Sequence, residues 1–177
     1  MRQRNDCHER CQAYGNVRVI LSRKEERRGR NEPAIARVGR IMDMVEILGR
    51  CGYRCDLCPA YVDNVKNDED RQITSDGWFK YFGFRVPPEE IGCPGCSPDC
   101  IDKDCPVRPC AEEKGLPNCG HCDDFPCPKV ESRMCFIEQY LAEHKDLVVP
   151  SEDYRRFFTP YESKERLIRI KAGGGTG

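Results

Sequence analysis

The sequence predicts a small mixed fold that is mostly α-helical, with little or no β-sheet, in which short helices pack on an irregular cysteine-rich segment. Eleven of the 14 cysteines lie between positions 51 and 127, and most are separated by two to four residues. The same 77 residues contain only 17 large apolar or aromatic side chains. That number is small for a self-supporting core, so the segment needs covalent or metal staples. After it, apolar residues recur at helical spacing.

The first predicted elements are two helices and a loop. Pro59 suits the first turn of a short helix that continues to Val65. Residues 69–84 carry an aromatic face suited to a second helix, which the following Pro-Pro pair ends. Residues 92–110 are rich in cysteine, proline and glycine, so we expect a loop shaped by whatever its cysteines bind. A short helical turn then ends at Gly115.

The strongest predicted helix spans residues 129–145, because four apolar side chains recur there at positions i, i+4, i+7 and i+11. These side chains are Val130, Met134, Ile137 and Leu141. Two shorter helices are predicted at 151–158 and 162–171, separated at Pro160. We expect the terminal AGGGTG to be flexible.

Charge divides the chain into three predicted parts. Residues 1–41 carry 11 Lys and Arg against 5 Asp and Glu, a formal charge of +6, and the rest of the chain carries −7. We expect 1–41 to be a basic, disordered extension, which is either a tail for nucleic acid or acidic partners or the product of a misassigned start at Met1 instead of Met42 or Met44. Residues 42–148 form the predicted cysteine-rich domain, and 149–177 form a helical tail.

The expected compartment decides how the cysteines are interpreted. The N-terminus has no apolar signal region, and no apolar run approaches the roughly 18 residues of a membrane helix. We therefore expect a cytoplasmic protein without a membrane segment. Thiols stay reduced in that compartment, so closely spaced cysteines favour metal binding over disulfides.

Three Cys-x2-Cys pairs carry the metal-binding prediction, because this spacing lets two sulfurs meet one tetrahedral ion from a tight turn. The predicted metal ligands are Cys51, Cys55, Cys58, Cys93, Cys96, Cys100, Cys105, Cys110, Cys119, Cys122 and Cys127. One arrangement pairs Cys93/Cys96 with Cys119/Cys122 at nearly zinc-ribbon spacing, although other cysteines are equally available. We expect His121 to fill a turn more readily than to bind metal.

Metal identity stays open between two candidates. Zinc in two or three sites, with a structural or interaction role, is the first hypothesis. The alternative is an iron–sulfur cluster that transfers electrons or supports an anaerobic enzyme, since thiolates suit either metal. The triplet CGYRCDLC has the cysteine spacing of radical S-adenosylmethionine enzymes. We disfavour that assignment because the chain is too short for the barrel such enzymes use.

Other activities have weaker support. CGHC at 119–122 matches thiol–disulfide oxidoreductases, but the DDFPCP that follows disfavours a reactive thiolate at a helix start. No catalytic constellation is convincing, so we lean toward a protein that is not an enzyme. The negative charge of residues 42–177 disfavours nucleic acid, whereas a protein partner remains open.

Several motifs in the same order resemble one family, domain of unknown function 3795. They are CGYRCDLCPAY (51–61), CPGC (93–96), VRPCAEEKG (107–115) and NCGHCDDFPCPKV (118–130). The resemblance covers roughly residues 48–130 and implies zinc binding through these cysteines. It implies no activity.

Overall fold

The computed structural model describes residues 20–22 and 46–173, and for 20–22 it describes the backbone alone. The six α-helices in this part of the chain are α2 (Asp68–Phe82), α3 (Val107–Glu113), α4 (Pro128–Met134), α5 (Phe136–Glu143), α6 (Ser151–Phe157) and α7 (Lys164–Gly173). The short 3-10 helices are η1 (Cys55–Leu57), η2 (Pro88–Glu90), η3 (Cys119–His121) and η4 (Thr159–Tyr161). The strands β1 (Ile20–Ser22) and β2 (Val148–Pro150) pair in parallel. The prediction of a mostly α-helical fold with little β-structure is therefore confirmed.

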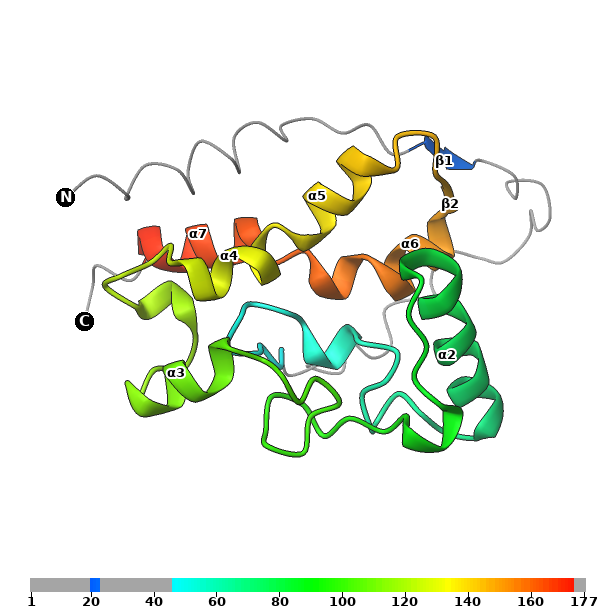
Figure 1. The fold of residues 1–177 in the computed structure, drawn as a ribbon, viewed down its shortest axis with the longest axis horizontal. Helices are drawn as coiled ribbons and strands as arrows, with labels where there is room; N and C mark the ends of the chain where they lie inside the picture. The colour runs from blue at the N-terminus through cyan, green and yellow to red at the C-terminus, as the bar shows by residue number, and fades with distance from the viewer. Residues whose placement is uncertain (1–19, 23–45, 174–177) are drawn as a thin grey trace, which may run out of the picture.

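Helices α4 to α7 run across one side of the molecule, as Figure 1 shows. The coil that carries the first cysteines, drawn in cyan, lies along this row, with α2 at one end and α3 at the other. α7 packs on η3, and α6 packs on α2. The C-terminal helices therefore cover both the cysteine-rich coil and the aromatic helix that follows it.

Capping residues set both ends of helix α2. The side chain of Asn67 accepts a hydrogen bond from the backbone N–H of Asp70 at 2.9 Å, which caps the first turn. Gly83 ends the helix in the left-handed conformation, with φ of 74°. Between them Trp78 and Tyr81 are buried, as expected for an aromatic face, whereas Phe79 is exposed.

Two hydrophobic clusters hold the helices together. The larger one joins α2, α5 and α6 and contains Ala60, Trp78, Tyr81, Ile91, Ile137, Leu141, Val149, Phe157 and Phe158. The smaller one joins α3, α4 and α7 and contains Cys51, Val107, Val130, Met134, Cys135 and Leu167. Residues from the predicted C-terminal tail lie in both clusters, so this tail contributes to the same cores as the cysteine-rich part.

The predicted single helix at 129–145 is wrong in one respect, because the chain forms two helices that meet at Cys135. The backbone of Cys135, with φ of −100° and ψ of 8°, departs from helical geometry. All four predicted apolar positions are buried. Val130 and Met134 belong to the smaller cluster, whereas Ile137 and Leu141 belong to the larger one. The break thus lets one apolar stripe serve two cores.

The predicted helix from Pro59 to Val65 is also wrong. These residues form successive turns, and Tyr61 makes an isolated parallel bridge with Cys93. The backbone N–H of Val62 donates to the carbonyl of Cys93 at 2.9 Å, which takes a donor that a helix would need. A contact distant in sequence therefore overrides the local helix signal of the proline.

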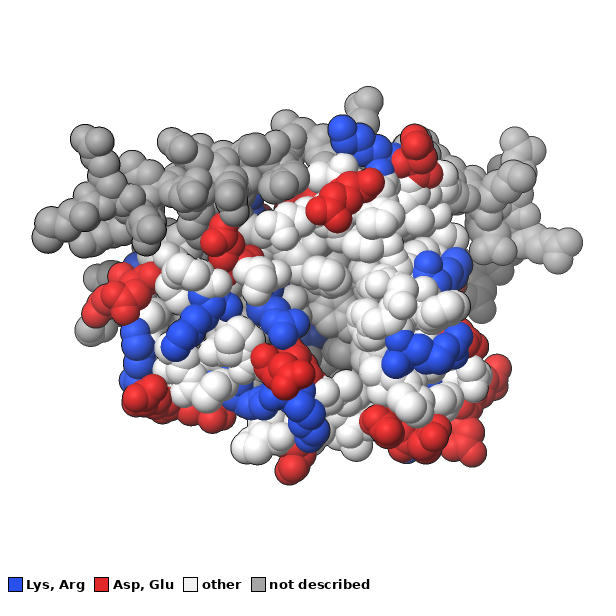
Figure 2. All heavy atoms as spheres, viewed as in Figure 1, with Lys and Arg blue, Asp and Glu red and all other residues white. Residues whose placement is uncertain are grey.

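Most of the predicted basic extension, residues 1–19 and 23–41, lies outside the described residues, as does the Gly-rich end at 174–177. In the part of the chain that is described, helices are too short or too polar to cross a bilayer. Figure 2 shows Lys and Arg side chains interspersed with Asp and Glu over the face in view.

Replacing Gly77 with alanine is expected to destabilise the protein, although alanine is the better helix former. A Cβ at Gly77 would lie 2.0 Å from Cζ of the buried Phe157 ring, so α2 and α6 would have to separate. We expect Gly77→Ala to lower the free energy of unfolding by about 2 kcal/mol, since overpacking outweighs helix propensity. Urea denaturation under reducing conditions measures this change.

Gly173→Ala is the matched control, because a Cβ there meets no atom within 4 Å. A second variant, Gly77→Ala with Phe157→Leu, is expected to lose less stability than the two single changes added together. An unchanged or raised stability of Gly77→Ala alone would contradict the close approach of the two helices.

Candidate metal centre

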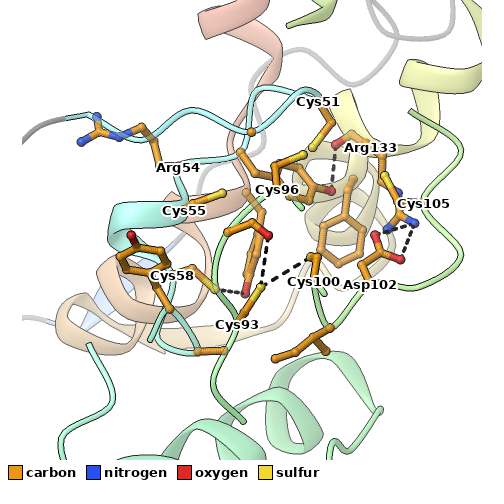
Figure 3. Close-up of a pocket in the computed structure, with 18 of the residues that line it drawn as sticks. Cys51, Arg54, Cys55, Cys58, Cys93, Cys96, Cys100, Asp102, Cys105 and Arg133 are labelled. Carbon is orange, nitrogen blue, oxygen red and sulfur yellow. Dashed lines mark hydrogen bonds and ion pairs between the residues drawn. The ribbon is translucent and has the colours of Figure 1, made fainter. Parts of the chain in front are cut away.

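A cavity of about 550 Å³ lies between two cysteine-bearing segments of the chain. Seven of the eleven predicted ligands line it, and their side chains surround a common space in Figure 3. They are Cys51, Cys55, Cys58, Cys93, Cys96, Cys100 and Cys105. The triplet that begins the cysteine-rich region and the loop near residue 100 thus face each other across one cavity.

The first three cysteines are positioned by a folded turn around η1. The carboxylate of Asp56 accepts the backbone N–H of Ile47 at 3.1 Å and two hydrogen bonds from Arg54, at 2.8 and 2.5 Å. The hydrogen bonds from Arg54 hold the pKa of Asp56 below its usual range, so this bidentate pair is charged at neutral pH. At Gly52, where φ is 86°, a Cβ would lie 2.7 Å from Cγ of Leu167. The turn is therefore pressed closely against α7.

The second segment reaches the first through backbone hydrogen bonds at Cys93. Its N–H donates to the carbonyl of Ala60 at 2.7 Å, and its carbonyl accepts the N–H of Val62 at 2.9 Å. The chain then turns through Gly95, where φ is 101°. This pairing places Cys93, Cys96 and Cys100 opposite the triplet, although more than thirty residues separate the two segments.

Several hydrogen bonds reach the cavity sulfurs. The indole N–H of Trp78 donates to Tyr161 Oη at 3.1 Å, and Tyr161 Oη lies 3.5 Å from Cys58 Sγ. Because the tyrosine oxygen already accepts from the indole, its own O–H is available for the sulfur. The backbone N–H of Arg50 donates to Cys96 Sγ at 3.4 Å. Donors of this kind stabilise a thiolate or a metal-bound sulfur.

Three arginines line the cavity, and they differ in their partners. Arg54 pairs with Asp56, and Arg133 pairs with Asp102 at 2.9 Å. Arg108 is only 8% exposed, and its described hydrogen bond goes to the backbone carbonyl of Asp102 at 3.3 Å. Among the described residues, no carboxylate forms an ion pair with Arg108. A buried guanidinium in this position favours an anion in the cavity.

Burial controls the charge of the cavity thiols in the absence of a cation. It raises the pKa of Cys55 to about 12, and it also raises the pKa values of Cys51 and Cys58. These groups are neutral thiols at pH 7 until a positive charge compensates the loss of solvation. Cys93 and Cys100 share a hydrogen bond between sulfurs 3.5 Å apart, which lowers the pKa of Cys93 and raises that of Cys100.

The remaining four predicted ligands form a second group away from the cavity lining: Cys110, Cys119, Cys122 and Cys127. Burial raises the pKa of Cys119 to about 12, and the neighbouring Cys127, Cys122 and Cys110 add to the increase. Lys114 Nζ lies 3.5 Å from Cys122 Sγ. Gly120 packs against α7, where a Cβ would lie 2.7 Å from Cγ2 of Ile170.

The eleven cysteines between 51 and 127 are free thiols. Cys93 and Cys96 line the cavity, whereas Cys119 and Cys122 lie outside its lining. His121 is exposed on η3. Within residues 20–22 and 46–173, no three His, Cys, Asp or Glu side chains stand together as a ready-made site for a metal ion.

Sequence reasoning missed Arg108 and Tyr161 as cavity residues. Arg108 lies two positions before Cys110, in a motif whose cysteine is the predicted ligand. Tyr161 lies about a hundred residues from Cys58 and has no spacing relation to it. Trp78 belongs to the predicted aromatic face of residues 69–84 and is buried, but its indole also donates to Tyr161.

Comparison with known proteins identifies a family that the chain resembles. No curated protein and no solved structure matches the chain. Residues 47–132 match the model of a family described as "Protein of unknown function (DUF3795)". The matched range includes both cysteine groups and the cavity-lining Arg108. Over these residues the chain resembles a family whose function is unknown, as its cysteine motifs predicted.

Proposed function

We propose that this protein binds a metal centre through cysteine thiolates, and that the cavity holds an iron–sulfur cluster. The observation that carries the proposal is the convergence of seven cysteines on one cavity. Four of them would ligate the cluster, since such clusters are held by Cys thiolates. When bound, the cluster would supply one-electron transfer. The chain would supply the thiolates, the hydrogen bonds to sulfur and the counter-charge.

The size of the cavity supports a multi-atom group over a single ion. Zinc binds sulfur at about 2.3 Å, which places the four sulfurs of one site about 3.8 Å apart. The described thiols do not form such a compact group. The cavity of about 550 Å³ instead falls within the roughly 300–1,000 Å³ of small-molecule and cofactor sites.

Electrostatics supports the same proposal. A metal centre held by several thiolates carries net negative charge, and Arg108 is a buried cation without a carboxylate partner among the described residues. Burial raises the pKa of Cys96, and the positive charge of Arg108 acts in the opposite direction. Arg108 would therefore stabilise thiolate ligands without binding the metal itself.

Zinc is the second candidate, and the second group of cysteines favours it. That group contains four thiols, the number that a closed structural zinc site takes. Cys119 and Cys122 flank a tight turn in which the N–H of Cys122 donates to the carbonyl of Cys119 at 3.1 Å. Because these thiols also do not form a compact group, zinc binding there would draw the four sulfurs closer together. The ion would then join η3 to the chain before α4.

The proposal is tested by purifying the protein without oxygen and measuring its metals and its visible spectrum. We expect a brown protein that contains iron and acid-labile sulfide, and Cys55→Ser is expected to lose the colour. Cys110→Ser is the matched control, because it removes a thiol outside the cavity. A colourless protein that contains zinc alone would contradict the cluster and favour the second candidate.

Removing the charge of Arg108 is expected to weaken the metal centre. We expect Arg108→Met to lower metal retention about tenfold or more, which is typical for partners that support ligands without touching the metal. Competition with a chelator of known affinity measures this change. Arg85→Met is the control, since Arg85 forms a partly exposed ion pair with Asp76 at 2.6 Å. Equal metal retention in both variants would contradict the role of Arg108.

Metal removal is expected to unfold the cysteine-rich coil while the aromatic core persists. Metal binding supplies on the order of 10 kcal/mol of folding free energy at a structural site. In contrast, α2, α5 and α6 share apolar contacts that need no metal. Amide hydrogen exchange on the reduced protein, with and without a chelator, measures both regions. Unchanged protection of residues 91–105 after metal loss would contradict this prediction.

A further inference from the structure

Cys93 and Cys100 form a thiol pair whose geometry differs from that of the other cavity cysteines. Their sulfurs lie 3.5 Å apart and share a hydrogen bond. A disulfide joins sulfurs at about 2.05 Å, so the pair would close with a movement of about 1.5 Å. Among the described cysteines, this is the pair whose sulfurs are hydrogen-bonded to each other.

The loop between the two cysteines permits such a movement. Residues 94–99 contain no helix or strand, and Gly95 adopts a φ of 101°. The backbone here consists of bends and turns. The N–H of Cys100 donates to the carbonyl of Ser97 at 3.0 Å, which brings the end of the loop back toward its start. Both thiols are half-buried and line the cavity, so a small reagent can reach them.

We propose that Cys93 and Cys100 are a redox-active dithiol that forms a reversible disulfide with a small disulfide, such as oxidised glutathione, as the oxidant. One protein thiolate attacks the small disulfide, which breaks its S–S bond, forms a mixed disulfide and releases one thiol. The second protein thiolate then attacks the protein sulfur of the mixed disulfide and releases the second thiol. Two electrons pass from the protein to the small disulfide, and the two protein protons end on the released thiols.

This pair is a better candidate than the CGHC motif that the sequence suggested for thiol exchange. Cys119 and Cys122 lie on and beside η3, which has three residues, and the following α-helix begins only at Pro128. Cys122 Sγ accepts a hydrogen bond from Lys114 instead of one from its motif partner. The motif therefore lacks the placement at an α-helix start that favours exchange.

The bond would also change the cavity. Two of the seven cavity thiols would become unavailable as ligands, so oxidation would release metal. This release of metal rests on the proposed function, whereas disulfide formation between Cys93 and Cys100 does not. The metal centre and the dithiol can therefore be disproved independently of each other.

The test treats the protein, as purified without oxygen, with oxidised glutathione at pH 8.5, where an ordinary thiol is about half thiolate. Free thiols are then alkylated under denaturing conditions, and tryptic peptides are analysed by mass spectrometry. The peptide 86–103 contains Cys93, Cys96 and Cys100. We expect it to lose the mass of two hydrogens and to carry one alkyl group, on Cys96. Metal released during the treatment is measured in the same sample.

Variants decide whether the pairing is specific. Cys93→Ser and Cys100→Ser are each expected to abolish the bond, and Cys96→Ser is expected to retain it. Alkylation of both Cys93 and Cys100 in the treated native protein would overturn the proposal, as would a bond from either one to Cys96. If the Cys93–Cys100 disulfide forms in a protein that is purified without metal, the redox-active dithiol is supported. That result would contradict the proposed metal centre alone.

Discussion

The backbone pairing of Cys93 with Ala60 and Val62 is the interaction on which the cavity depends. It joins two segments whose buried residues Ala60 and Ile91 also lie in the larger hydrophobic cluster. Because Cys93 uses both its N–H and its carbonyl in this contact, the loop that follows has a defined starting point. Two sets of cysteines thereby face each other from loops that contain little regular structure.

The aromatic core and the cavity are parts of one packing arrangement. Trp78, Phe82, Phe136 and Tyr161 line the cavity, and the Phe82 ring contacts Phe136 and Phe158 with centroid distances of 5.3 and 5.1 Å. Tyr161 connects the two regions directly, because its oxygen contacts both the indole of Trp78 and the sulfur of Cys58. Side chains of the helical core therefore line the cavity together with the cysteine loops.

The arginines around the cavity thiols differ in whether a carboxylate neutralises them. Arg54 and Arg133 have carboxylate partners, whereas the buried Arg108 lacks one in the described part of the chain. Burial keeps Cys51 and Cys55 neutral in the absence of a cation, since it penalises the thiolate. A positively charged metal would reverse that penalty and would give the arginine its counter-charge. The thiols and the arginine thus complement each other chemically.

The local sequence determined the helix of residues 68–82, the apolar stripe from Val130 to Leu141, and the presence of a cysteine-rich region short of apolar residues, because spacing and composition act within a few turns of the chain. Tertiary contacts decided the rest. The helix signal at Pro59 lost to a pairing with Cys93, and the stripe was broken at Cys135 so that it serves two cores. Packing between distant segments decides which cysteines share a cavity, and it brings Arg108 and Tyr161 to the same cavity. The spacing of cysteines along the chain does not predict that packing.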